Sequence, residues 1–165
     1  MNATRPFLIL GTLFGLLLTS ACSREQAAET DPAAAEDMPT ADAPAALPRT
    51  ASPQGATVFF ITPGDGDTVP NPVSIEFGID GMSVVAAGVN AAHSGHHHLL
   101  VDTDPPAMGL PIPADANHIH FGDGSTSTEL TLAPGEHTLR LLLGDHAHIP
   151  HNPPVMSEPI TITVK

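Results

Sequence analysis

The stretch Val73-Ser74-Ile75-Glu76-Phe77-Gly78-Ile79-Asp80 decides the fold class, because large apolar residues occupy every second position. A strand with one buried face has this period of two, whereas an amphipathic helix repeats about every 3.6 residues. The alternation returns at 139–143 and at 160–164, where aliphatic residues stand at every second position. Residues 73–80 therefore predict a strand that covers a hydrophobic core with one of its faces.

Further short segments of this kind lie on both sides, and turn residues separate them. Ala133-Pro134-Gly135-Glu136 is a turn sequence, and Pro159 stands at a strand start, where a missing backbone donor is tolerated. No stretch has the pattern of a long helix. The predicted strands are 57–61, 73–79, 97–101, 118–121, 126–132, 137–144 and 159–164. The pattern thus predicts an all-β fold, an immunoglobulin-like β-sandwich of about seven strands.

The first 22 residues predict export from the cytoplasm. Arg5 precedes an apolar run at 7–18, which is shorter than the roughly 20 residues needed to span a bilayer. Small residues and then the single cysteine, Cys22, follow this run. That junction resembles the lipobox of bacterial lipoproteins, in which the cysteine is lipidated and becomes the mature N-terminus. We therefore expect a lipoprotein signal peptide at 1–21; a plain secretory signal with an incidental cysteine is the alternative.

Residues 22–54 predict the lipidated cysteine followed by a disordered tether. The segment is rich in alanine, proline and acidic residues, and Leu47 is its only large aliphatic residue. Such a composition buries too little apolar surface to offset the entropy of ordering. Residues 55–165 then form one domain of ordinary size. Ser23 follows the cysteine, so we expect an outer-membrane anchor facing the periplasm in the envelope of a Gram-negative bacterium.

The charge of the chain restricts its partners. It has 18 acidic and 5 basic residues, which give a formal net charge of −13. Such a surface repels phosphate backbones and anionic lipid headgroups, and it attracts cations. We therefore exclude nucleic acid as a partner and expect membrane contact only through the lipid anchor at Cys22.

All 10 histidines lie after residue 92, in the predicted sandwich. Neutral imidazole is the commonest protein ligand for late transition metals. With seven strands in this order, segments that carry nine of these histidines reach one end of the sandwich, whereas His137 lies at the opposite end. The histidines at the shared end are His93, His96, His97, His98, His118, His120, His146, His148 and His151. This placement predicts a metal site there, with a metal ion as partner and copper or zinc as the cofactor.

Alternation along the strands selects the ligands. His97 shares a strand face with core residues, so we expect it to be a hydrogen-bonded core histidine. The predicted ligands are His96, His98, His118 and His120, completed by His146, His148 or His151 from the following loop. Asp123 and Asp145 are the carboxylates predicted to orient a ligand ring. The alternative for His118, His120 and His151 is a structural role in which they bond loop carbonyls.

Several long motifs resemble an uncharacterised bacterial family, domain of unknown function 4399. The resemblance spans residues 56–165, and its motifs are 95–102, 112–122, 143–146, 148–151 and 153–157. The family carries no assigned activity, so the resemblance identifies the domain and leaves its function open. Residues 118–123 are also similar to the copper-ligand strand of copper/zinc superoxide dismutases, and residues 62–66 resemble small periplasmic copper carriers.

Three functions from different classes remain open. The first is a periplasm-facing lipoprotein that binds copper or zinc for buffering, delivery or sensing. The second is a non-enzymatic interaction or scaffold module of the envelope, in which the histidines are structural. The third is a dismutase-like or hydrolase-like metal enzyme, for which Asp102 and Asp104 are weak candidates for the general base. A serine hydrolase is disfavoured because no serine lies in a G-x-S-x-G elbow.

Overall fold

The computed structural model describes residues 45–165. The predicted signal peptide and Cys22 lie outside the described residues. The described part has two sheets and no helix, which confirms the predicted all-β sandwich. Its nine strands are β1 (Thr57–Thr62), β2 (Thr68–Val69), β3 (Val73–Asp80), β4 (Ser83–Val84), β5 (Ser94–Val101), β6 (His118–His120), β7 (Ser127–Leu130), β8 (Gly135–Gly144) and β9 (Ile160–Val164). From residue 45 onward, no helix is long and apolar enough to cross a membrane.

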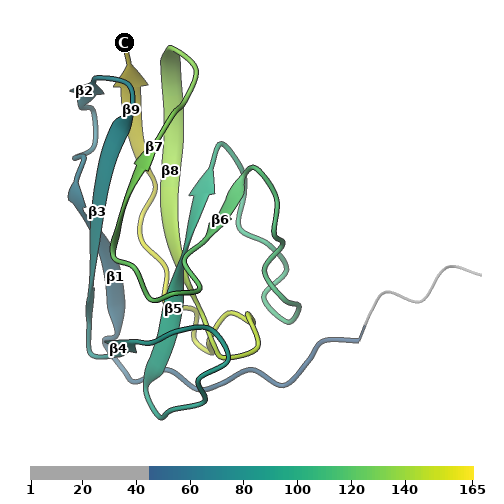
Figure 1. The fold of residues 1–165 in the computed structure, drawn as a ribbon. Coiled ribbons are helices and arrows are strands. Elements are labelled where there is room, and N and C mark those ends of the chain that lie inside the picture. Colours follow the sequence, from purple (N-terminus) through teal and green to yellow (C-terminus); the bar gives the residue numbers. More distant parts are fainter. Residues whose placement is uncertain (1–44) are drawn as a thin grey trace, which may run out of the picture. The chain divides into compact units, whose positions relative to one another are not determined.

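The two sheets form the layers seen in Figure 1. One sheet has the order β1-β3-β7, and the other has the order β2-β9-β8-β5-β4, with β6 also paired to β5. Because β8 occupies one edge of β5, both β4 and β6 pair with the other edge. The strand count exceeds the prediction by two because β2 and β4 each have only 2 residues, too few to show a period.

The main core lies between the sheets. In β3, Val73, Ile75 and Phe77 are almost fully buried, as the opening alternation predicts. Leu99 of β5 and Leu141 of β8 pack against them from the opposite sheet. Full burial of each such side chain stabilises the fold by about 1.5–3 kcal/mol.

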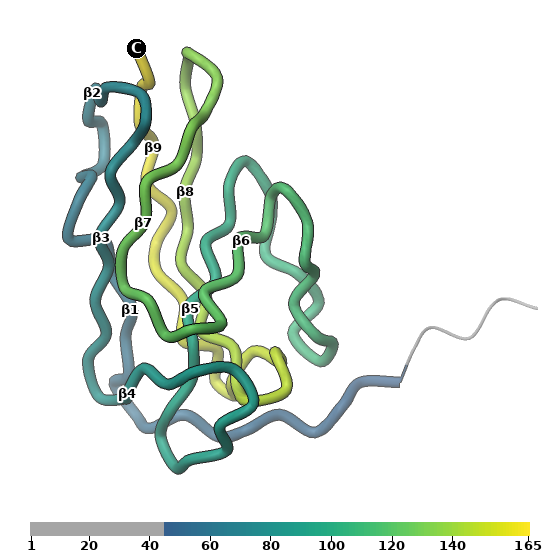
Figure 2. Tube along the Cα trace, in the orientation of Figure 1, coloured from purple at the N-terminus to yellow at the C-terminus, as the bar shows by residue number. Residues whose placement is uncertain are grey.

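Strand β5 differs from the other strands because every residue in it is buried. Its odd-numbered residues face the main core. Its even-numbered residues face the outer side of the sheet, where Leu100 packs with Ile112, Leu142 and Met156 in a small second cluster. Figure 2 shows the chain between β5 and β6, and the chain between β8 and β9, beside this strand. The even-numbered histidines of β5 are therefore buried on the outer side of the sheet rather than in the main core.

The chain just before β1, which the sequence assigned to the predicted tether, binds to the domain. We name residues 46–52 the strap. The backbone N–H of Leu47 donates to the Gly109 carbonyl at 2.7 Å, and Ser52 N–H donates to the Asn152 carbonyl at 3.2 Å. The Arg49 guanidinium donates from Nε to the Pro150 carbonyl at 2.9 Å. Ordered contacts thus begin earlier than the predicted tether end at residue 54, because composition does not show such specific polar bonds.

Candidate metal centre

The register of β5 with its neighbours places three histidines on one face. His98 of β5 is paired with His120 of β6, and His96 is paired with Gly144 of β8. Directly opposed residues of an antiparallel pair point to the same face. Residues 96 and 98 also share a face because side chains alternate along a strand. His96, His98 and His120 therefore converge on the outer side of the six-stranded sheet.

These three side chains form a group that could hold a metal ion. Each offers one ring nitrogen, and the three nitrogens lie within 4.8 Å of one another. His96 and His98 are 0% and 1% exposed, whereas His120 is exposed. The group therefore has two buried imidazoles beneath one that an ion in solution can reach.

A fourth imidazole, that of His148, lies against this group from the chain that follows β8. Its ring centroid is 4.8 Å from that of His96 and 4.7 Å from that of His120. The Nε2 atoms of His148 and His120 are 3.2 Å apart, which is a hydrogen bond when one of the two nitrogens carries a proton. We name the four residues His96, His98, His120 and His148 the histidine cluster.

The turn that carries His148 is built around the Asp145 carboxylate, which is buried. Its Oδ1 accepts hydrogen bonds from the N–H groups of Ala147 at 2.9 Å and Ile149 at 3.0 Å, and its Oδ2 accepts one from the Thr50 hydroxyl at 2.6 Å. Burial raises the pKa of the Asp145 carboxyl, but these hydrogen bonds outweigh that effect and hold it below its usual value. Asp145 therefore shapes the backbone of the turn, whereas the sequence predicted that it orients a ring.

Two glycines make room for the rings of the cluster. A Cβ atom added at Gly144 would lie 2.7 Å from Cε1 of His98, and one added at Gly122 would lie 2.9 Å from Nε2 of His120. Real Cβ atoms essentially never come so close to other atoms. Both glycines were visible in the sequence beside a histidine motif, but only the register shows which ring each one accommodates.

Burial keeps the cluster in its neutral form. Burial, together with the neighbouring imidazoles, lowers the pKa of His96 to about 4 and that of His98 to about 3. Burial and the His148 imidazole lower the pKa of His120 as well, although Asp123 opposes this shift. Neutral imidazole is the form that binds metal. His96, His98 and His120 are therefore neutral and ready to bind a metal ion at neutral pH.

The buried nitrogens of the cluster are also unpaired. Both ring nitrogens of His96 and Nδ1 of His98 have no hydrogen-bond partner within residues 45–165. Most buried polar atoms in native proteins do have a partner, so each exception calls for an explanation. A bound metal ion would supply a partner for one nitrogen of each ring.

Comparison with known proteins agrees with the resemblance seen in the sequence. The family model described as Domain of unknown function (DUF4399) matches residues 75–165. The chain belongs to the DUF4399 family. The match begins within β3, so β1 and β2 precede it, and it includes the whole histidine cluster. No curated protein and no solved structure matches the chain.

The remaining predicted ligands of this DUF4399 domain lie elsewhere. His118 is opposite Leu100, farther along β6 from the cluster, and its Nδ1 is 2.8 Å from the Asp115 carboxylate. The buried ring of His151 lies beneath Gly95, on the core side of β5, and its nitrogens contact the Ser94 and Leu143 carbonyls. Neither residue belongs to the group of described residues that could hold a metal ion.

Two further predicted residues of the DUF4399 domain are not part of the cluster either. His146 is half-buried, and its carbonyl accepts a hydrogen bond from Gly88. The Asp123 carboxylate accepts a hydrogen bond from the Ser125 N–H at 3.0 Å, so it closes a local turn instead of orienting a ring.

His97 lies in the main core, as predicted, but it is not hydrogen-bonded to the described part of the chain. Its ring packs edge-on against Phe77, with the ring centroids 4.7 Å apart. Burial lowers the pKa of His97 to about 4, so the ring is neutral there. The core thus accommodates His97 as an aromatic ring.

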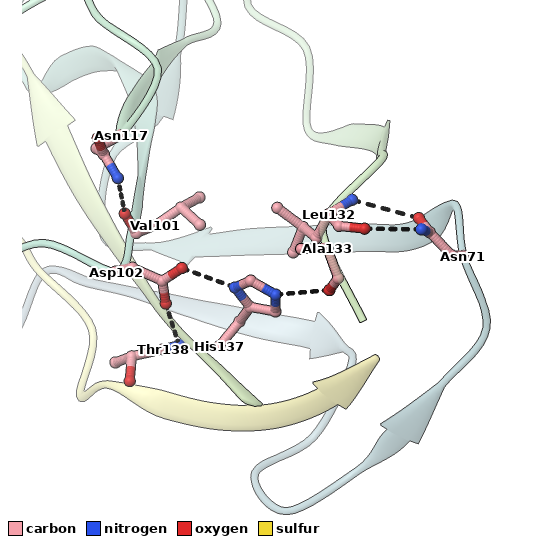
Figure 3. Close-up of polar contacts among 8 residues, drawn as sticks. All are labelled: Asn71, Val101, Asp102, Asn117, Leu132, Ala133, His137 and Thr138. Carbon is pink, nitrogen blue, oxygen red and sulfur yellow. Dashed lines mark hydrogen bonds and ion pairs between the residues drawn. The ribbon is translucent and has the colours of Figure 1, made fainter. Parts of the chain in front are cut away.

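Figure 3 shows His137, which the sequence excluded from the site, near the opposite end of β8. Its Nδ1 is 2.7 Å from an oxygen of the Asp102 carboxylate, and its Nε2 is 2.8 Å from the Ala133 carbonyl. The second oxygen of Asp102 accepts a hydrogen bond from the Thr138 N–H at 2.8 Å. Asp102 is therefore engaged in holding β8, away from the cluster.

Proposed function

We propose that this chain is a periplasm-facing lipoprotein that binds a transition metal ion, copper or zinc, through His96, His98 and His120. The observation that carries the proposal is the convergence of two buried imidazoles, three of whose nitrogens lack partners in the described chain, with a third exposed one. Imidazole nitrogen suits zinc and copper. The net charge of −13 favours the approach of a cation.

His137 and His151 differ from this group and argue against a purely structural role for it. His137 contacts a hydrogen-bonding group with each of its ring nitrogens, and so does His151. These are the contacts that histidines make when they hold loops together. Leaving a buried polar atom unpaired costs about 1–3 kcal/mol, so three such atoms at one place favour a ligand-binding role.

The cellular location of the protein is part of the proposal and rests on the sequence. The apolar run at 7–18 and the small residues before Cys22 support a lipoprotein signal. Because the chain has no other cysteine, the lipidated residue would be Cys22. An anchor there would hold the metal-binding domain at the membrane surface through the segment that precedes the strap.

Metal analysis tests the proposal directly. We expect the full chain, purified without a polyhistidine tag from bacterial membranes, to retain close to one copper or zinc ion through gel filtration. The variant His96→Ala/His98→Ala/His120→Ala should lose it, whereas the control His93→Ala should keep it, because His93 is exposed and outside the group. Intact mass should show acyl groups on a chain that begins at Cys22.

The outcomes separate metal binding from the alternatives. A metal-free chain whose melting temperature does not respond to zinc(II), copper(I) or copper(II) would contradict metal binding and favour the interaction module. A mass without acyl groups would contradict the anchor and leave the metal site in place.

A further inference from the structure

We propose that His148 is the fourth ligand of a closed, tetrahedral, all-imidazole site suited to a d10 ion, zinc(II) or copper(I). This inference rests on the proposed metal binding and adds a ligand, a geometry and a class of ion. It also predicts that the bound ion has no open coordination position for catalysis.

The spacing of the four rings carries the inference. Metal–nitrogen bonds of about 2.0–2.1 Å would place the ring centroids of a tetrahedral site about 5.2 Å apart. A square-planar site, which copper(II) prefers, would instead need four separations near 4.5 Å and two diagonals near 6.4 Å, by the same ~2.0 Å bonds. Five of the six separations in the cluster are 4.7–5.0 Å, and the sixth, from His98 to His148, is 6.0 Å. With one long separation in place of two, the cluster is closer to a tetrahedron.

The nitrogen positions agree with the ring positions. Two ligands on a tetrahedral ion with bonds of about 2.0–2.1 Å have nitrogens about 3.3 Å apart. The Nε2 atoms of His120 and His148 are 3.2 Å apart, so this pair already has the required spacing. The nitrogens of His96, His98 and His120 lie within 4.8 Å of one another, so ring movements of about 1.5 Å would bring these three to the same spacing.

The backbone around His148 is fixed before any ion binds. His148 N–H donates to the Asp145 carbonyl at 2.9 Å, and the His148 carbonyl accepts a hydrogen bond from Ile112 at 2.8 Å. Its φ of 65° is unusual for a residue other than glycine. Such a conformation persists only where the surroundings hold it, and this one directs the His148 ring to the cluster.

Cobalt(II) is a suitable probe because it replaces zinc(II) and reports geometry through its visible spectrum. We expect the full chain with one cobalt(II) to show the intense visible bands of a tetrahedral complex, unchanged by added azide, because no coordination position is open. His148→Ala should bind zinc(II) at least about 10-fold more weakly. Loss of a residue that only hydrogen-bonds to a metal ligand already lowers metal affinity by about that factor, and His148 is proposed as a ligand itself. Its cobalt(II) bands should shift with azide, which can enter the vacated position.

His146→Ala is the matched control because it removes a histidine from the same turn, outside the cluster. It should behave as the unchanged chain in affinity, spectrum and azide response. Displacement of cobalt(II) by zinc(II), and by copper(I) under a reductant, identifies the preferred d10 ion, and either result supports the geometry.

Three results would overturn the inference while leaving metal binding intact. They are weak octahedral cobalt(II) bands, azide sensitivity in the unchanged chain, and a tetragonal copper(II) complex that forms in preference to both d10 ions. A chain that binds none of these ions would remove the proposed function as well, so the two failures can be distinguished.

Discussion

The histidines near the two ends of β8 differ in whether their ring nitrogens have hydrogen-bond partners. Near its start, His137 lies between the Asp102 carboxylate and the Ala133 carbonyl, and both of its ring nitrogens have partners. At its other end, roughly 20 Å away along the strand, Gly144 is paired with His96, whose two nitrogens are buried without a partner in the described chain. A histidine therefore links two parts of the structure at one end, whereas at the other end its nitrogens are unpaired and available to a ligand.

The surroundings of each ring account for this difference. At the His137 end, the carboxylate hydrogen bond raises the pKa of the imidazole and favours its charged form. At the cluster end, burial and the neighbouring imidazoles lower the pKa and favour the neutral form. A charged ring suits an ion pair, and a neutral ring suits a metal. The number of histidines in a segment therefore says less about metal binding than the partners that each ring finds.

The largest effect is expected from Gly144→Ala, which should damage the cluster end alone. The new Cβ would lie 2.7 Å from Cε1 of His98 and 3.3 Å from Cδ1 of Ile112, so the His98 ring must move. Overpacking of this kind costs about 1–3 kcal/mol, and a displaced ligand should also reduce metal affinity at least about 10-fold. Thermal unfolding and zinc titration measure the two effects.

Gly64→Ala is the control for that substitution. Its nearest neighbour would be a side-chain oxygen of Asp67 at 3.4 Å, an ordinary contact, and Gly64 has no positive φ. We expect near-native stability and full metal affinity. If Gly144→Ala kept full affinity as well, His98 would not be a ligand in its observed position.

An intermediate effect should appear when the pH is changed in the presence of a chelator. Because the pKa values of His96 and His98 fall to about 4 and about 3 in the folded chain, the unfolded chain binds protons first as the pH drops below about 6.5. The free energy of unfolding should therefore fall with pH between about 6.5 and 4, by up to about 1.4 kcal/mol per pH unit for each histidine. His137 should do the opposite, since its raised pKa stabilises the fold below about pH 6.5 and that contribution is lost as the pH rises through the raised value.

Denaturant unfolding at several pH values separates the two ends. His98→Leu should flatten the decline of stability below about pH 6.5, because it removes a group that only the unfolded chain protonates in that range. His137→Ala should leave that slope unchanged and lower stability most below about pH 6.5, with a smaller loss above the raised pKa of His137. His97, whose pKa is about 4 because it is buried, contributes to the decline in both variants. Identical pH profiles for the two variants would contradict the contrast between the two ends.

The strands that line the main core were predictable because each has one buried face and shows a period of two. The beginning of β5 was not, because that strand is buried on both faces and its residues 94–96 are serine, glycine and histidine. The sequence therefore predicted a strand from residue 97, whereas β5 begins at Ser94. The histidines at its start lie within the strand, and this placement buries His96.

The members of the cluster were all among the predicted ligands, but the sequence could not separate them from their neighbours. Only the register shows that His120 is opposite His98 while His118 is opposite Leu100. Which loop histidine reaches the cluster depends on the turn at Asp145, and the strap that supports this turn has the composition of a disordered segment. Contacts between distant polar residues leave no local period in the sequence.

The smallest effect is expected from Thr50→Val, which removes the hydrogen bond from the strap to the Asp145 carboxylate. Asp145 keeps its bonds from Ala147 and Ile149, so we expect a loss of only about 1 kcal/mol in the free energy of unfolding. Because the same carboxylate shapes the turn that carries His148, zinc affinity should weaken as well. Ser52→Ala removes a strap bond of 2.8 Å to the Pro153 carbonyl and leaves Asp145 untouched.

Comparing these two strap variants shows whether the strap supports the metal centre or only the fold. If both variants lose a similar small amount of stability but only Thr50→Val binds zinc more weakly, the strap supports the metal site through Asp145. Equal zinc affinity in both variants would contradict that connection. The turn at Asp145 would then be held by its own backbone bonds, as β8 is held at its other end by the Asp102 carboxylate.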